Sequence, residues 1–161
     1  SKLLLKNQDI SDFTENQLAN FRNHELGFIF QFHQLLPEFN VIENICIPAF
    51  IKKTPKNIAE SKANQLMNYL GISDRSKNKP NELSGGEKQR VAVARALINE
   101  PSIILADEPS GNLDSNTSNN LHELFLSLRK DFNYTFVIAT HNISLAKKSD
   151  RVLEIKDGKI K

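Results

Sequence analysis

The chain has 161 residues, of which 39% are hydrophobic and 25% are charged, so it can bury a core and is not a disordered tail. Its formal net charge of +2 lacks the basic excess that a nucleic-acid partner needs, and its single cysteine, Cys46, excludes an internal disulfide framework. No apolar run approaches the ~20 residues that span a bilayer, and residues 1–6 are too short and too polar for a signal peptide. We therefore expect a compact, soluble cytosolic domain.

The first 39 residues predict a strand, a helix and a second strand. The apolar run at 3–5 predicts the first strand, and the polar stretch 12–22 predicts the helix. The continuous apolar run 26–30, which ends at Gln31, is typical of a strand buried on both faces.

Residues 40–100 differ in character and predict a helical subdomain. The stretch 57–70 lies between Pro55 and Gly71, which is the arrangement expected of a helix with a C-terminal stop. Its apolar stripe consists of Ala59, Ala63, Leu66 and Leu70. A second helix is expected over 87–99, ended by the proline at position 101.

From residue 102 onward the pattern alternates between strand and helix. Buried strands are expected at 103–106 and 136–139, and helices at 114–130 and 143–148. The dipeptide Asp157-Gly158 between two short apolar runs predicts a hairpin. This alternation predicts an α/β fold with a largely parallel sheet.

Polar residues follow three of the expected strands, where α/β proteins bind ligands. They are Gln31, the pair Asp107-Glu108, and His141 after Thr140. Two adjacent carboxylates at a strand tip predict a Mg²⁺ ligand in Asp107 and a residue that polarises an attacking water in Glu108. The alternative interpretation of this pair is a solvated acidic turn.

A second candidate site lies in the string Leu83-Ser-Gly-Gly-Glu-Lys-Gln-Arg90. The paired glycines Gly85 and Gly86 permit close approach of an anion, and the helix that follows supplies free N–H groups and a positive dipole end. With the hydroxyl of Ser84 they form a phosphate cradle. The alternative is an ordinary helix start with Ser84 as N-cap.

Four strings together resemble the nucleotide-binding domain of an ABC transporter. They are Leu-Ser-Gly-Gly-Glu-Lys-Gln-Arg at 83–90, Ile-Leu-Ala-Asp-Glu-Pro at 104–109, Ser-Gly-Asn-Leu-Asp at 110–114 and Thr-His at 140–141. They occur in the family's order and spacing, and the resemblance covers essentially the whole chain. It implies a P-loop NTPase-like α/β sheet core (1–39 with the Q-loop, and 101–161) with an inserted helical subdomain (40–100).

The resemblance also implies a role for each strand-end residue. Gln31 would be the Q-loop glutamine that senses Mg²⁺ and the γ-phosphate of ATP. Asp107 would be the Walker B carboxylate that holds Mg²⁺, and Glu108 the catalytic base. His141 would be the switch histidine that contacts the γ-phosphate.

The remaining motif residues would act across a dimer of two such domains. Ser84, Gly85 and Gly86, followed by Glu87, would form the signature loop that binds the ATP held by the opposite subunit. Asp114 would close the D-loop, which runs across the dimer interface.

Residues 30–39, with Glu43-Asn44 and Pro48, are similar within this family to ATPases of lipoprotein-releasing systems. That similarity implies integral-membrane partner subunits, a homodimer, and a peripheral position on the cytoplasmic face of the bacterial inner membrane. The string at 110–114 is shared with macrolide-exporter and cell-division ATPases, which remain alternatives.

A DNA-repair or chromosome-maintenance ATPase is disfavoured because no sustained heptads separate Gln31 from Ser84. A non-hydrolytic scaffold is disfavoured because Glu108 and His141 are present.

The family's phosphate-binding Walker A loop, Gly-x-x-x-x-Gly-Lys-Ser/Thr, does not occur in the sequence. None of the six glycines precedes Lys-Ser or Lys-Thr. Residues 2–10 resemble the strand that follows the Walker A helix in the family. We therefore expect an N-terminally incomplete ATPase domain, which by itself neither binds nor hydrolyses ATP.

Overall fold

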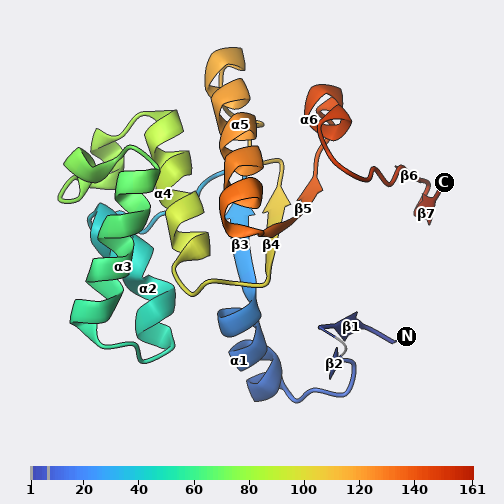
Figure 1. Cartoon of the computed structure of the whole chain (residues 1–161), viewed down its shortest axis with the longest axis horizontal. Helices are drawn as coiled ribbons and strands as arrows, with labels where there is room; N and C mark the ends of the chain where they lie inside the picture. Colours follow the sequence, from blue (N-terminus) through green and yellow to red (C-terminus); the bar gives the residue numbers. More distant parts are fainter. Residues whose placement is uncertain (1, 7) are drawn as a thin grey trace.

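The centre of the molecule is a three-stranded parallel sheet (Figure 1). The computed structural model describes residues 2–6 and 8–161, so Ser1 and Asn7 of the predicted segment 1–39 lie outside the described residues. The strands are β3 (Leu26–Phe30), β4 (Ile103–Asp107) and β5 (Thr135–Ala139), in the order β3-β4-β5. The predicted α/β fold with a parallel sheet is confirmed.

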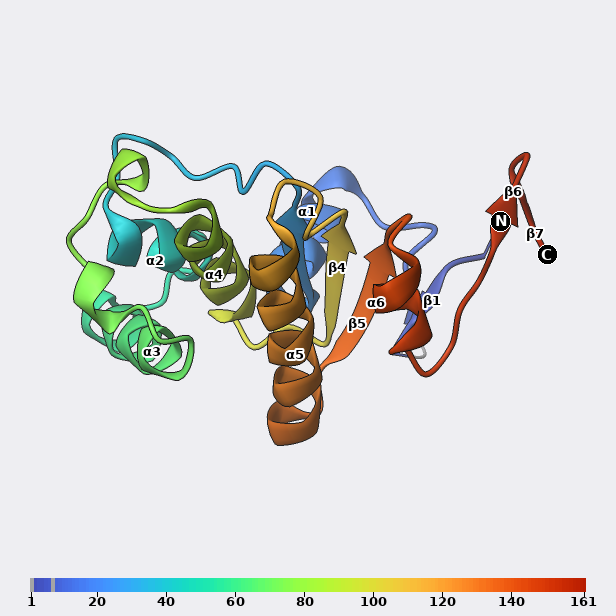
Figure 2. The same ribbon diagram turned by 90° about the horizontal axis from the view of Figure 1, so that it is seen from above.

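The predicted burial of these strands on both faces is wrong. Burial alternates along β3 and β4, and no residue of β5 is fully buried. The face that carries Ile29 and Ile104 is covered, because α4 (Gly85–Leu97) and α5 (Ser115–Phe132) lie on that side of the sheet (Figure 2). On the other face Val137 is 54% exposed, since none of the described helices covers it.

Close contact between β3 and α4 depends on Gly27. A Cβ atom at this position would lie 2.6 Å from the carbonyl oxygen of Ala96. That distance is shorter than any ordinary contact, so only glycine lets α4 approach the sheet this closely. The signature string is thereby joined to the sheet through the helix that it begins.

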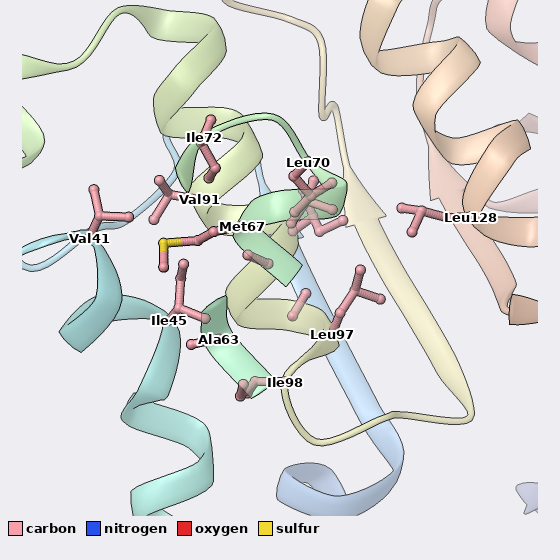
Figure 3. Close-up of a cluster of buried hydrophobic side chains, with 14 of the residues drawn as sticks. Val41, Ile45, Ala63, Met67, Leu70, Ile72, Val91, Leu97, Ile98 and Leu128 are labelled. Carbon is pink, nitrogen blue, oxygen red and sulfur yellow. The ribbon is translucent and has the colours of Figure 1, made fainter. Parts of the chain in front are cut away.

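Within residues 40–100, α2 (Val41–Ile51) and α3 (Lys56–Tyr69) pack against α4. Figure 3 shows Met67 of α3 pointing toward Ile45 of α2 inside this cluster. The predicted stripe on α3 needs one correction, because Met67 is fully buried and Leu66 only partly. The reason is spacing: position 67 continues the i, i+4 series of Ala59 and Ala63.

Two connections of this region are single 3₁₀ turns, η1 (Ser73–Arg75) and η2 (Pro80–Glu82). The helix α3 ends before Gly71, which has φ +68° and so adopts the left-handed conformation expected at a helix stop.

The N-terminal helix α1 (Glu15–Glu25) begins three residues later than the predicted 12–22. Thr14 is the reason, because it caps the helix and exchanges hydrogen bonds with Gln17 in a capping box. The predicted first strand is the two-residue β1 (Leu4–Leu5), which pairs with β2 (Gln8–Asp9) in a separate hairpin.

The C-terminal part contains α6 (Ile143–Lys147) and a hairpin of β6 (Ile155–Lys156) and β7 (Lys159–Ile160). Asp157 and Gly158 have φ values of 51° and 74°, as a tight hairpin turn requires, so the predicted hairpin is confirmed. Among the residues that the structure describes, no helix is long and apolar enough to cross a bilayer.

Candidate functional site

The carboxyl ends of the three strands meet at one edge of the sheet. The register pairs Phe30 with Asp107 and Asp107 with Ala139. Gln31, Glu108 and Thr140, which follow these positions, therefore start from neighbouring points of the backbone. The predicted convergence of strand-end residues follows directly from this register.

The Glu108 carboxylate is fixed by hydrogen bonds from the loop after β5. Its Oε1 accepts from the backbone N–H of His141 at 2.8 Å and lies 2.7 Å from His141 Nδ1. Its Oε2 accepts from the hydroxyl of Thr140 at 3.0 Å. The side chain of Glu108 is 23% exposed, and that of His141 is 86% exposed. A partly buried carboxylate is thus held beside an open imidazole.

Backbone geometry turns Glu108 into this position. Glu108 has φ 41°, an uncommon left-handed conformation for a side chain of this kind, and its N–H donates to the carbonyl of Ala139 at 2.9 Å. Partial burial raises the pKa of the Glu108 carboxyl, but the hydrogen bonds from His141 and Thr140 outweigh it and leave the pKa below its ordinary value. Glu108 is therefore ionised at neutral pH.

Asp107 and Gln31 provide oxygen donors beside Glu108. The Asp107 carboxylate is exposed and makes no hydrogen bond or ion pair with the residues that the structure describes. The Gln31 amide donates to Asn112 Oδ1 at 3.3 Å, and Asn112 Nδ2 donates to the Gln31 carbonyl at 3.2 Å. The carbonyl that accepts from Asn112 belongs to the backbone of Gln31, so the side-chain Oε1 of Gln31 remains available. A free carboxylate and an amide oxygen are ligands that suit Mg²⁺.

The predicted signature loop begins α4. Ser84 accepts a hydrogen bond from the Glu87 N–H at 3.3 Å, and Glu87 Oε2 accepts from the Ser84 N–H at 2.8 Å. Ser84 is thus the N-cap, as the alternative interpretation predicted. This does not exclude phosphate binding by the loop, because the N–H groups of Gly85 and Gly86 have no partners within the helix.

Glu87 is engaged within the chain. Besides its capping bonds, its Oε1 accepts from Arg75 Nε at 2.7 Å. The backbone and side chain of Ser84 and the Arg75 guanidinium together lower its pKa to about 2. In this conformation Glu87 shapes the loop rather than facing outward; its predicted contact with ATP stays a prediction.

The predicted D-loop lies between the two groups of site residues. Asp114 caps α5 by accepting from the N–H groups of Asn116 and Thr117, each at 3.0 Å. A Cβ at Gly85 would lie 3.6 Å from the Leu113 side chain. No hydrogen bond or ion pair within residues 2–6 and 8–161 joins the Ser84 loop to Glu108 or His141. The strand-end group and the signature loop both border the D-loop, since a Cβ at Gly111 would lie 2.8 Å from Gln31 Nε2.

Sequence reasoning missed three residues of this region. Thr140 was recognised only as part of a motif, although its position after a strand and before His141 signals a role in holding Glu108. Asn112, which exchanges hydrogen bonds with Gln31, comes 81 residues later and gave no local signal. The buried His122, whose Nε2 lies 3.2 Å from the Ser110 hydroxyl, fixes the same D-loop from α5.

The parallel sheet, the carboxylates at the end of β4 and the Ser84-Gly85-Gly86 signature loop are features of a nucleotide-binding ATPase domain. The sequence profile of the family described as "ABC transporter" matches residues 1–111. The chain therefore belongs to the ABC transporter family.

More specific similarity comes from individual proteins. The "Lipoprotein-releasing system ATP-binding protein LolD" of Bacteroides fragilis is 55% identical over 152 residues, covering 94% of this chain and 70% of the relative. The protein of the same name from Cytophaga hutchinsonii is 53% identical over 156 residues, covering 97% and 71%. The resemblance to this group of ATPases, inferred from residues 30–39, is confirmed.

Solved structures agree with the fold. The "Dimeric Structure of MJ0796, a Bacterial ABC Transporter Cassette" has a TM-score of 0.86 and 34% identity, covering 99% of this chain and 70% of that one. A second structure of that cassette, in a post-hydrolysis state with bound ADP and Pi, has a TM-score of 0.87 and 33% identity.

Proposed function

We propose that this protein is the ATP-hydrolysing subunit of a lipoprotein-releasing system, peripheral to the cytoplasmic face of the bacterial inner membrane and joined to integral-membrane subunits. The observation that carries the proposal is the Glu108 carboxylate fixed by Thr140 and His141 at the carboxyl ends of the strands. The named relatives support the choice of lipoprotein release over macrolide export or cell division.

Glu108 acts as the base that orients the attacking water. An ionised carboxylate has about four acceptor positions. Three are used by the His141 N–H, the His141 ring and the Thr140 hydroxyl, so one position on Oε2 is left for a water. The Thr140 and His141 bonds aim this position and limit its motion, which is what general base catalysis requires.

His141 contacts the γ-phosphate with its second ring nitrogen. Because Nδ1 faces the Glu108 carboxylate, it carries a proton and donates. Nε2 then points to solvent from a side chain that is 86% exposed. Nε2 is thus the ring nitrogen that would face a phosphate oxygen.

Asp107 and Gln31 would hold Mg²⁺, which would neutralise charge on the phosphate oxygens. The partnerless Asp107 carboxylate and the free amide oxygen of Gln31 fit that ion. Asn112 orients Gln31 through two hydrogen bonds, and Gly111 makes room for it, since a Cβ there would lie 2.8 Å from Gln31 Nε2.

Two copies of the chain complete each other's sites. The exposed Ser84 and Gly85, with the free N–H groups at the start of α4, bind the γ-phosphate of ATP held by the second copy. Among the described residues no hydrogen bond or ion pair joins the signature loop to Glu108, as expected if each copy completes the site of the other. The dimeric form of the similar cassette MJ0796 supports it as well.

The phosphate-holding P-loop motif is not among these 161 residues. A polypeptide of just this sequence is therefore expected not to bind ATP tightly, because backbone amides and a lysine normally cradle the β- and γ-phosphates. Equilibrium binding of a fluorescent ATP analogue with Mg²⁺ tests this, and tight binding would contradict it.

Depletion of the protein in its own cell tests the proposed process. We expect outer-membrane lipoproteins to accumulate in the inner membrane, and expression of the wild-type protein to restore their sorting. Normal lipoprotein sorting, with a septation defect or increased macrolide sensitivity instead, would assign the chain to one of the alternative systems.

A further inference from the structure

The loop after Gln31 contains two consecutive residues in the left-handed conformation. His33 has φ 55° and Gln34 has φ 48°. Residues with a Cβ atom avoid this region, so the turn requires outside support to persist. Local bonds begin it, because the His33 N–H donates to the Phe30 carbonyl at 3.2 Å and the Gln34 N–H donates to the Phe32 carbonyl.

Arg95 of α4 supplies the support. Its Nη2 donates to the His33 carbonyl and its Nη1 to the Gln34 carbonyl, each at 2.6 Å. Two parallel donors on a planar guanidinium match two successive carbonyls, a geometry that lysine cannot reproduce. No ion pair among the described residues involves Arg95, so its half-buried charge is satisfied by the two loop carbonyls.

The same loop is also held at its far end. Buried Asn44 of α2 accepts from the Leu36 N–H at 2.8 Å and donates to the carbonyls of Leu36 and Phe39, each at 3.0 Å. Gln31 is tied to Asn112 at the near end. Arg95 holds the middle of the loop, at His33 and Gln34. It lies on α4, the helix that begins at the Ser84 loop.

We propose that Arg95 is a positioning residue of the ATPase site, which holds the left-handed His33–Gln34 turn and so ties Gln31 to the signature helix α4. A shift of Gln31 at the bound nucleotide would then pull on α4 through this guanidinium, and a shift of α4 would displace Gln31. This inference rests on the proposed ATPase function.

The first test is Arg95→Met in a full-length subunit that carries the P-loop, assembled with its membrane subunits. We expect kcat to fall by at least about tenfold, because a misplaced site residue far from the chemistry has effects of this size. The KM for ATP should change by less than about threefold, since Arg95 does not touch the nucleotide. Tyr69→Phe is the matched control; it removes a 2.6 Å bond to Asp131 between α3 and α5, away from the loop, and kcat should be retained.

A rescue variant separates positioning from simple stabilisation. Asparagine adopts the left-handed conformation more readily than glutamine. Adding Gln34→Asn to Arg95→Met should therefore recover part of the lost kcat. A residue that only stabilised α4 would not be rescued by a change in the loop, so absence of recovery would overturn the proposal.

Hydrogen–deuterium exchange of residues 32–36 gives a readout that does not depend on ATP hydrolysis. Arg95→Met should accelerate exchange there, and Tyr69→Phe should not. If Arg95→Met does not fold, Arg95→Lys, which keeps the charge but loses the paired geometry, replaces it with the same expectations. Unchanged exchange would overturn the proposal. If Arg95→Met exchanges faster but the wild-type assembly shows no ATPase activity, the result would count against the proposed function and not against the role of Arg95 in holding the loop.

Discussion

Replacing Glu87 by alanine should lower the free energy of unfolding by about 2 kcal/mol. The substitution removes a capping box and the partly exposed ion pair of Glu87 with Arg75. Glu87 accepts from the Ser84 N–H at 2.8 Å and from Arg75 Nε at 2.7 Å, and it lies in the first turn of α4. The capping part contributes about 1 kcal/mol. The ion pair and the helix dipole add about 0.5 kcal/mol each.

The pKa of Glu87 gives an independent bound. A fall of the pKa from its ordinary value of 4.5 to about 2 corresponds to about 3 kcal/mol before solvent screening. The Glu87 side chain is 26% exposed. Solvent screening therefore lowers the stabilisation derived from the pKa toward the value of about 2 kcal/mol obtained from the separate contacts. Because the folded-state pKa is depressed, the stabilisation is fully present above pH ~4.5 and is lost as the pH falls toward 2.

The assay is urea unfolding of wild type, Glu87→Ala and Glu87→Gln at several pH values. Glutamine keeps an oxygen that can accept from Ser84 but loses the charge, so it should lose about 1 kcal/mol, half of the alanine effect. The difference between wild type and Glu87→Gln should shrink as the pH falls below 4.5. A difference that stays constant down to pH 2 would refute the electrostatic part, and equal losses for both variants would refute the capping part.

Two further predictions concern packing. Gly27→Ala should destabilise the protein by about 1–3 kcal/mol, because the new Cβ would lie 2.6 Å from the Ala96 carbonyl and force α4 off the sheet; an unchanged melting temperature would contradict this contact. Gln89→Met should stabilise the protein by about 1 kcal/mol, since both amide atoms of this buried side chain lack a partner in the described structure. A lower melting temperature of Gln89→Met would contradict that prediction.

The sheet and its strand-end residues could be predicted because their signals are local. Apolar runs set the strands, and parallel strands end at one edge, so Gln31, Asp107 and His141 had to converge. The helix α2 carried a weaker signal, since Pro48 lies inside it and breaks the expected helical pattern.

The remaining features depend on partners distant in the sequence. Arg95 and the His33 carbonyl are 62 residues apart, and no periodicity relates them. Burial on both faces of the strands was predicted from apolar runs, which report hydrophobicity but not which face a helix covers. The exposed Val137 shows the difference.

The most direct test of the central claim is ATP hydrolysis by Glu108→Gln in a full-length subunit that carries the P-loop, assembled with its membrane subunits and measured together with ATP binding. Glutamine preserves the size of the side chain but is a poor base, and it can no longer accept from His141 and Thr140 as a carboxylate does. We expect turnover to fall by about 10²-fold or more while ATP binding stays within about threefold of wild type. Hydrolysis at the wild-type rate would contradict the assignment of Glu108 as the base.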